Sequence, residues 1–409
     1  MHHQAIQRAV VCASIFVTLG GVAAFAQSGS TRPRRVTPTA TTVQNPTPLE
    51  TPTPTPVPTP RPARVAVAAS SASAADTTRA YALLEQKQYE AAAREAKRIA
   101  AIDPKNGEAW KIAGFAEFNL KQYKEAATDL QRALELQRAA GQEDANTIDA
   151  LGQAYVRTEQ FEPALPLLVA ATERAGAKPD AVLLYYRGLA EFRTGKPTDA
   201  ERSFNAAVKA DPKNAASHFY LGRIASERNQ LDAAITALNR ATQSDLRFAE
   251  AWTLLTYSYL RRAAQAGAGP KADADYLSAI RASDSLLKLR NDEASVALHA
   301  QALVGAQQYA RAALALERFA ANPNAQGTTL YLLGVAHSRA KNLPKAVAAL
   351  ERAAAKTPDD VNVYRELGYA YEVSKQYAKA LAAYEKGVTL APAEADLKES
   401  AERVRPFAK

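Results

Sequence analysis

The chain has 409 residues, of which 47% are hydrophobic and 23% are charged, so it is long enough for several folded units. Its formal net charge of +9 raises nucleic acid as a partner. The single cysteine, Cys12, lies near the N-terminus, which excludes a disulfide framework and leaves the rest of the chain without a thiol nucleophile.

The N-terminal segment, residues 1–26, has the three parts of a secretory signal peptide. It contains Arg8, an apolar run from Ala9 to Phe25, and the small residues Ala24 and Ala26 of a cleavage site. This pattern predicts cleavage after Ala26 and export to the periplasm or the extracellular medium. An uncleaved membrane anchor is the alternative, because the apolar run approaches spanning length.

Residues 27–72 are rich in proline and threonine, most regularly over Thr51–Pro62. Alternating prolines favour an extended polyproline II chain without a core, so we expect a disordered linker that acts as a tether. Five arginines against one glutamate make residues 27–75 net positive, which allows contact with a cell wall or a membrane surface. A proline motif read by a partner domain is the alternative.

From residue 73 onward the chain repeats one unit, and the clearest copy is 361–394. Its first half places Tyr364, Leu367, Gly368 and Tyr371 at i, i+3, i+4 and i+7, one face of a helix. Its second half repeats this with Tyr377, Ala380 and Tyr384, and Pro392 marks the end. The unit is therefore two short helices joined by a turn.

Small residues recur where the two helices of a unit approach each other. The first-helix residues are spaced by 34, 38, 36, 34, 34, 44, 34 and 34 along the chain: Ala80, Gly114, Gly152, Gly188, Gly222, Thr256, Ala300, Gly334 and Gly368. Their second-helix partners are all alanine: Ala92, Ala126, Ala164, Ala200, Ala234, Ala279, Ala312, Ala346 and Ala380.

The 34-residue unit has a bulky residue, Leu-Gly and Tyr in its first helix, Ala in its second helix and Pro at its end. In these positions the chain resembles the tetratricopeptide repeat family. The resemblance implies an all-α fold, a right-handed α-solenoid of about nine helix-turn-helix repeats. The repeats are 73–106, 107–144, 145–180, 181–214, 215–248, 249–292, 293–326, 327–360 and 361–394, and residues 395–409 form a capping helix and tail.

The sixth repeat departs from the period. Residues 262–275 replace the tight turn by an Ala/Gly-rich segment, which lacks the spacing of a phosphate-binding loop. We predict a solvent-exposed loop there, with a contact element as the alternative. Thr256 in the same unit predicts weaker packing between the two helices.

No pattern in the sequence predicts catalysis. His218, His299 and His337 lie in three different first helices, where packing is expected rather than metal binding, and H-E-x-x-H and G-x-S-x-G motifs are missing. Acidic pairs such as Asp359-Asp360 fall at predicted helix starts, where they cap. We therefore expect neither an enzyme nor a bound metal or cofactor.

The resemblance implies that first helices line a concave groove. On a helix that advances about 100° per residue, first-helix positions 2, 5, 9, 12 and 13 point away from the repeat core. Arginine and aromatic residues recur there, as in interface hot spots. The primary candidates are Lys111, Phe115, Phe118, Arg157, Tyr185, Phe192, Arg193, Phe219 and Arg223, and the secondary ones are Tyr257, Arg261, Tyr331, Arg339, Arg365 and Tyr369.

About half of these aromatic residues are expected to pack between first helices instead of facing a partner. Acidic residues share the same positions, which favours a peptide or protein segment over nucleic acid. The family's clamp for a C-terminal carboxylate does not carry over, because Phe115 stands where that clamp needs asparagine.

The sequence thus predicts a non-enzymatic interaction scaffold of the bacterial cell envelope that binds a protein or peptide. A structural subunit of a secretion or polysaccharide-export assembly is the alternative, followed by carbohydrate binding. The partner and the oligomeric state stay open.

Overall fold

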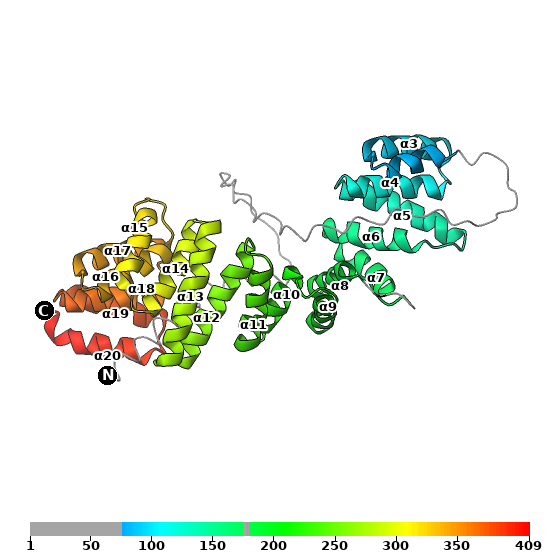
Figure 1. Cartoon of the computed structure of the whole chain (residues 1–409). Coiled ribbons are helices and arrows are strands. Elements are labelled where there is room, and N and C mark those ends of the chain that lie inside the picture. Colours follow the sequence, from blue (N-terminus) through cyan, green and yellow to red (C-terminus); the bar gives the residue numbers. More distant parts are fainter. Residues whose placement is uncertain (1–75, 175–177, 179) are drawn as a thin grey trace. The chain divides into compact units, whose positions relative to one another are not determined.

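The computed structural model describes residues 76–174, 178 and 180–409, and all regular structure in these residues is helical (Figure 1). The predicted all-α architecture is confirmed. The predicted signal peptide, residues 1–26, and the linker, residues 27–72, lie outside the described residues.

Nine helix pairs follow one another in the described residues, and one further helix ends the array. From α4 onward, each first helix begins at the first residue of a predicted repeat, and α20 begins at the first residue of the predicted capping segment. The bounds are α2 (Thr78–Glu85), α3 (Tyr89–Ile102), α4 (Gly107–Asn119), α5 (Tyr123–Ala139), α6 (Ala145–Arg157), α7 (Phe161–Thr172), α8 (Ala181–Arg193), α9 (Pro197–Ala210), α10 (Ala215–Glu227), α11 (Leu231–Ser244), α12 (Ala249–Ala266), α13 (Pro270–Leu289), α14 (Glu293–Gly305), α15 (Tyr309–Ala320), α16 (Gly327–Arg339), α17 (Leu343–Lys356), α18 (Val361–Val373), α19 (Tyr377–Leu390), α20 (Ala395–Val404) and the 3-10 helix η2 (Arg405–Phe407).

The described chain divides into two compact units, residues 76–224 and residues 225–409. Within each unit a helix packs on the next one along the chain, as α4 does on α5 and α18 on α19. First helices also contact each other: α4 touches α6, and α14 touches α16. Each unit is thus a stack of repeats in which the first helices have neighbours on several sides.

Small residues allow the two helices of a repeat to approach closely. All nine second-helix alanines predicted from the spacing are fully buried. A Cβ built on Gly114 would lie 2.5 Å from Cγ of Leu130, and one on Gly368 would lie 2.5 Å from Cε1 of Tyr384. Glycine is therefore required at these positions because the facing side chain fills the space that a Cβ needs.

Most first helices begin on an asparagine or aspartate cap. The side chain of Asn106 accepts a hydrogen bond from the Ala109 amide at 3.0 Å, and that of Asp360 accepts one from the Asn362 amide at 2.9 Å. The predicted capping role of the acidic pair is confirmed at Asp360.

The turn inside most repeats contains one residue in the left-handed conformation. It is a glycine in repeat four (Gly195, φ 77°), but elsewhere it carries a side chain, as at Lys341 (φ 64°) and Lys375 (φ 60°). Such residues are strained, because Cβ comes close to the following carbonyl oxygen.

Exchanging Lys375 for asparagine, which tolerates this conformation, is expected to stabilise the chain by about 1 kcal/mol. Urea unfolding followed by circular dichroism measures the effect. The same exchange at the exposed Lys398 inside α20 should act in the opposite direction, because asparagine is a poor helix former. An equal response at both positions would contradict the assignment of strain to the turn.

The predicted loop over residues 262–275 is wrong for most of its length. Helix α12 continues to Ala266 and α13 begins at Pro270, so only residues 267–269 lie between them. Both glycines of this short turn have positive φ, and Pro270 takes the first helical position, where its missing N–H has no cost. The extra residues of repeat six therefore lengthen both of its helices.

Thr256 lies inside this repeat. It is fully buried, and its hydroxyl donates a hydrogen bond to the carbonyl of Trp252 at 2.8 Å. A threonine thus fits where the other repeats have glycine or alanine.

None of the helices in the described residues has both the length and the apolar character needed to cross a membrane.

Candidate partner-binding surface

Most of the predicted groove aromatics are buried. Phe115, Phe118, Tyr185, Phe219 and Tyr331 have exposed fractions between 0% and 6%. The prediction that these five side chains face a partner is therefore wrong. The first helices α4 and α16 contact the next first helices, α6 and α18. Tyr185 and Phe118 also lie against rings of their own second helices, Phe204 and Tyr123.

Two of the buried candidates belong to an aromatic cluster between repeats four and five. Tyr220 stacks on Phe204 with ring centres 5.1 Å apart, and the rings of Tyr220 and Phe219 are nearly perpendicular with centres 5.3 Å apart. Tyr185 lies 6.2 Å from the same Tyr220 ring. These rings bury a large apolar area, so Tyr185 and Phe219 serve inter-repeat packing.

Lys111, another primary candidate, is also buried, with an exposed fraction of 8%. Its ammonium group lies 2.8 Å from the carboxylate of Glu108 and 3.4 Å from that of Asp144. Because Asp144 caps α6, Lys111 links repeats two and three and is not available as a free cation.

Arg157 is half-buried between two rings. Its guanidinium carbon lies 5.4 Å from the ring centre of Tyr123 and 5.5 Å from that of Tyr186, a cation–π arrangement that spans three repeats. Burial raises the pKa of Tyr186 to about 12, although the charge of Arg157 opposes the rise. Tyr186 therefore keeps its proton over the physiological range.

The remaining primary candidates are Arg193 and Arg223, which are exposed, and Phe192, which is half-buried. The guanidinium carbon of Arg193 lies 5.1 Å from the ring centre of Phe161. That of the exposed Arg223 lies 4.9 Å from the ring centre of Phe192. The Arg193 side chain is 49% exposed, and the nearest carboxylate, that of Glu159, is 4.0 Å away. We call Phe161, Phe192, Arg193 and Arg223 the arginine–aromatic strip.

The strip has a defined chemistry. A guanidinium held over a ring by a cation–π contact still carries N–H donors that can bind a carboxylate or a peptide carbonyl. The rings beneath fix the two arginines, so less side-chain entropy is lost on binding. The strip is therefore suited to an extended segment that carries acidic and apolar side chains.

The secondary candidates in residues 225–409 are largely engaged inside the chain. Arg261 donates to the carbonyl of Ser226 and to the side chain of Asn229 at 3.1 and 2.8 Å. Arg339 pairs with Glu366 at 2.8 Å and lies over the half-buried ring of Tyr369.

Two further secondary candidates also have internal contacts. Arg365 pairs with Glu394 and Asp396, at 2.9 and 2.8 Å, and so fastens the cap to the last repeat. The half-buried ring of Tyr257 lies 5.8 Å from the guanidinium of its neighbour Arg261.

Sequence reasoning missed Phe161, because it considered first helices alone. A signal was present: the first residue of the second helix is aromatic in several repeats, as at Tyr123, Phe161, Tyr309 and Tyr377. In two repeats this ring supports an arginine from the end of a first helix.

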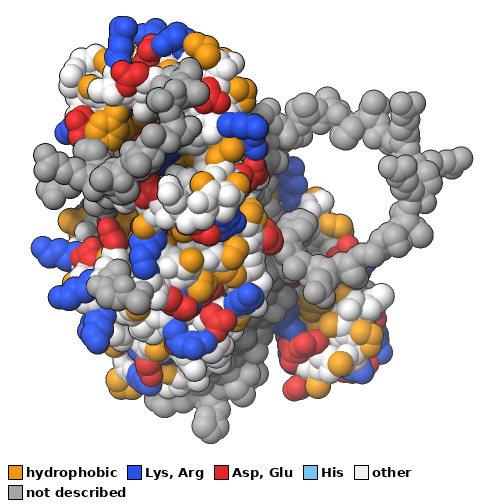
Figure 2. Space-filling model, turned by 90° about the vertical axis from the view of Figure 1, so that its right-hand side faces the viewer, with side chains coloured by type: hydrophobic (Ala, Val, Ile, Leu, Met, Phe, Trp, Pro, Cys, Tyr) orange, Lys and Arg blue, Asp and Glu red, His pale blue; other side chains and the backbone are white. Residues whose placement is uncertain are grey.

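Charge on the molecule is mixed. The face drawn in Figure 2 carries basic and acidic side chains side by side, without a field of one sign. A polyanion would be held by a continuous basic surface. No such continuous basic surface is seen among the described residues drawn in Figure 2.

The histidines pack as predicted. His218 Nε2 lies 3.0 Å from the carbonyl oxygen of Pro212, and His299 Nδ1 lies 2.9 Å from the hydroxyl of Ser283. Burial lowers the pKa of His299 and of His337. Among the described residues, histidine, cysteine and carboxylate side chains nowhere gather in the groups of three that could hold a metal ion.

The family model for the tetratricopeptide repeat matches residues 77–144, 150–215, 185–245, 298–361 and 331–395, which together are more than half of the chain. The chain belongs to the tetratricopeptide repeat family. The comparison with curated proteins finds no match.

Several solved structures align with parts of the chain. A tetratricopeptide repeat protein from Parabacteroides merdae is 16% identical and aligns with 64% of this chain and 98% of its own, at a TM-score of 0.42. YrrB, described as a tetratricopeptide repeat protein with an unusual peptide-binding site, is 19% identical. It aligns with 53% of this chain and 99% of its own, at a TM-score of 0.38. MamA from Desulfovibrio magneticus RS-1 is 25% identical and aligns with 40% of this chain and 88% of its own, at a TM-score of 0.34.

Proposed function

We propose that this tetratricopeptide repeat protein is a non-enzymatic scaffold of the bacterial cell envelope that binds a peptide or protein segment through the arginine–aromatic strip. The observation that carries the proposal is the pair of exposed arginines, Arg193 and Arg223, each stacked on an aromatic ring. The few residues that dominate the affinity of a protein interface are enriched in arginine, tyrosine and tryptophan.

The envelope location is supported by residues 1–26 and by the Pro/Thr-rich segment that follows. An exported chain with a proline-rich tether holds its repeats away from its point of attachment, where a partner can reach them. Repeats stacked on their neighbours form a preorganised surface, which reduces the entropic cost of binding an extended segment.

Site-specific photocrosslinking tests the proposal. The photoreactive residue p-benzoylphenylalanine replaces Phe192 in the full chain, and the envelope fraction of the producing cells is irradiated. We expect a discrete crosslinked partner, and Arg193→Glu should lower its yield at least tenfold, about 1.4 kcal/mol of binding free energy.

Two matched variants control the experiment. The crosslinker at Leu314, which is 74% exposed on a second helix, should not capture this partner. Arg240→Glu makes the same charge change at an exposed position of α11 and should leave the yield unchanged. Equal capture from Phe192 and Leu314, or equal loss in both arginine variants, would refute the strip and favour a structural subunit that docks through another face.

A further inference from the structure

The contact between Arg193 and Phe161 depends on how helix α7 lies against helix α8. Phe161 is the first residue of α7 and Arg193 is the last residue of α8, so the two side chains meet at one end of this helix pair. Residues 173–180 link α7 to α8, whereas residues 103–106 are enough to link α3 to α4. Because a longer link allows more arrangements of the helices it joins, contacts between α7 and α8 have to fix their orientation.

Arg187 of α8 supplies such contacts at the other end of α7. Its guanidinium donates hydrogen bonds to the hydroxyl of Thr172 at 3.0 Å and to the carboxylate of Glu173 at 2.8 Å. Thr172 is the last residue of α7, and Glu173 is its C-cap. Thr172 is buried and the Arg187 side chain is 21% exposed, so this junction lies largely inside the molecule.

A buried carboxylate holds Arg187 in place. Glu191, one turn later on α8, is 3% exposed, and one of its oxygens accepts a 2.8 Å hydrogen bond from Arg187. Its other oxygen accepts a 2.6 Å hydrogen bond from the hydroxyl of Ser203 on α9. The N–H donors of a guanidinium keep fixed directions in one plane. An arginine held by Glu191 therefore presents its other donors to α7 in one geometry.

Two separate anchors thus fix α7 against α8. Phe161 and Thr172 stand at opposite ends of α7, roughly 16 Å apart at a helical rise of about 1.5 Å per residue. Arg187 and Arg193 are likewise separated along α8, by roughly 9 Å at the same rise. One anchor would let α7 pivot, but two define its direction. Pro166 inside α7 removes a backbone hydrogen bond, which makes this helix more dependent on outside contacts.

We propose that Arg187 is a positioning residue for the arginine–aromatic strip. It fixes the C-terminal end of α7 against α8 and so keeps Phe161 beneath the guanidinium of Arg193. Its own guanidinium is engaged inside the chain rather than with a partner. The effect of Arg187 on binding rests on the function proposed above, whereas its effect on the contact between Arg193 and Phe161 can be measured without a partner.

Fluorine NMR of the full chain with 4-fluorophenylalanine in place of Phe161 measures this contact. The fluorine senses the guanidinium charge over the ring, so Arg193→Ala gives the signal of an uncovered ring. Arg187→Gln/Glu191→Gln removes the ion pair without leaving a buried charge unpaired, and the new amide can still accept from Ser203. We expect this variant to move the signal most of the way to the Arg193→Ala value. Arg187→Lys keeps the charge but not the planar fork and should move it less.

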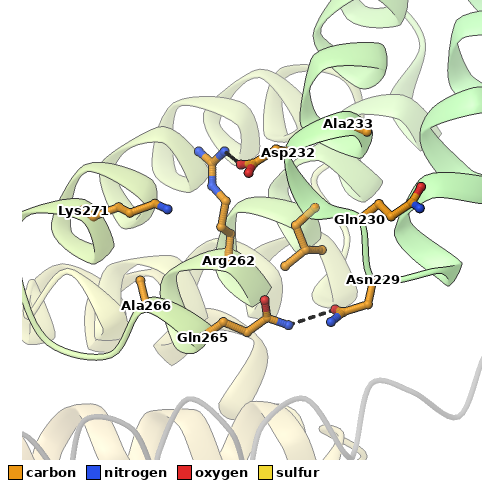
Figure 3. Close-up of a pocket in the computed structure, with 9 residues that line it drawn as sticks. Asn229, Gln230, Asp232, Ala233, Arg262, Gln265, Ala266 and Lys271 are labelled. Atoms are coloured by element: carbon orange, nitrogen blue, oxygen red, sulfur yellow. Dashed lines mark hydrogen bonds and ion pairs between the residues drawn. The ribbon is translucent and has the colours of Figure 1, made fainter.

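Repeat six offers a matched control. The Arg262 side chain is 23% exposed and binds the buried carboxylate of Asp275 with hydrogen bonds of 2.9 and 2.6 Å. Figure 3 shows its further contact with Asp232. Arg262→Gln/Asp275→Asn therefore removes an equally buried ion pair between neighbouring helices, but it touches no residue of the strip. It should lower the resistance to urea and leave the fluorine signal unchanged.

The crosslinker at Phe192 then measures the consequence for binding. Capture of the partner should fall about fivefold in Arg187→Gln/Glu191→Gln, because ordering the strip then costs side-chain entropy, and stay unchanged in the control. A fluorine signal that stays in place, or that moves equally in the control, would overturn the role of Arg187 and leave the strip standing. If the signal moves but neither this variant nor Arg193→Glu lowers capture, Arg187 does position the contact and the function proposed for the strip is refuted.

Discussion

Replacing Leu397 by aspartate is expected to unfold the C-terminal end of the repeat array. Leu397 is fully buried, and its methyl groups reach the backbone of α19 at Gly387, where a Cβ would lie 3.2 Å away. The exchange removes a packed side chain and places a carboxylate in an apolar site, at a cost of about 3–5 kcal/mol.

The effect should be local, because each repeat contacts only its neighbours. Hydrogen–deuterium exchange should accelerate in α18, α19 and α20 and stay unchanged in α2 and α3. Lys398→Asp places the same residue one position later, at an exposed site, and should have little effect. Similar rates of hydrogen–deuterium exchange in both variants would show that α20 does not seal the last repeat.

A buried acidic pair in the first two repeats should make their stability depend on pH. Glu117 of α4 and Asp129 of α5 are 2% and 5% exposed, and both lie against the ammonium group of Lys97 from α3. Burial raises the pKa of Glu117 to about 7, and repulsion by Asp129 adds to the rise although Lys97 opposes it. Burial likewise raises the pKa of Asp129, and the nearby Glu125 contributes.

The sign of the pH dependence of stability follows from the raised pKa of Glu117. The unfolded chain loses the Glu117 proton near pH 4.5, but the folded chain holds it to about pH 7. Folding is therefore favoured below pH 4.5, and this contribution is lost as the pH rises through 7. The loss between pH 5 and pH 8 should be on the order of 3 kcal/mol, since each pKa unit corresponds to about 1.4 kcal/mol.

Urea unfolding at several pH values, with hydrogen exchange of α3, α4 and α5 as the local readout, measures this dependence. Glu117→Gln should remove most of it and stabilise these helices at pH 8. Glu125→Gln removes the same charge at an exposed position of α5 and should keep most of the dependence. An unchanged pH profile in Glu117→Gln would contradict the assignment.

Local features of the sequence were enough to place the helices. Small residues at a fixed interval, such as Gly114 with Ala126, mark where two helices touch, and both lie where the spacing put them. This works because a tetratricopeptide repeat is stabilised by contacts between residues close in sequence.

The candidate surface was harder to predict. Phe115 and Tyr185 occupy positions that point away from their own repeat, yet they are buried, whereas Arg193 and Arg223 remain accessible. Periodicity gives the direction of a side chain on its helix, but it does not say which neighbouring helix covers it. That depends on contacts between repeats, and Phe161 was missed for the same reason.

The sequence alone determined the period, the helix pairs and the small residues between them, because these follow from the geometry of single helices. Only the tertiary structure decided the helix lengths and the turn of the sixth repeat. Gly267 and Pro270 are helix-breaking residues that favour a loop, but Arg262 joins Asp275 and Asp232 and keeps both helices extended up to a short turn. An ion pair between two helices is formed only when they pack, so residue-by-residue propensity cannot reveal it.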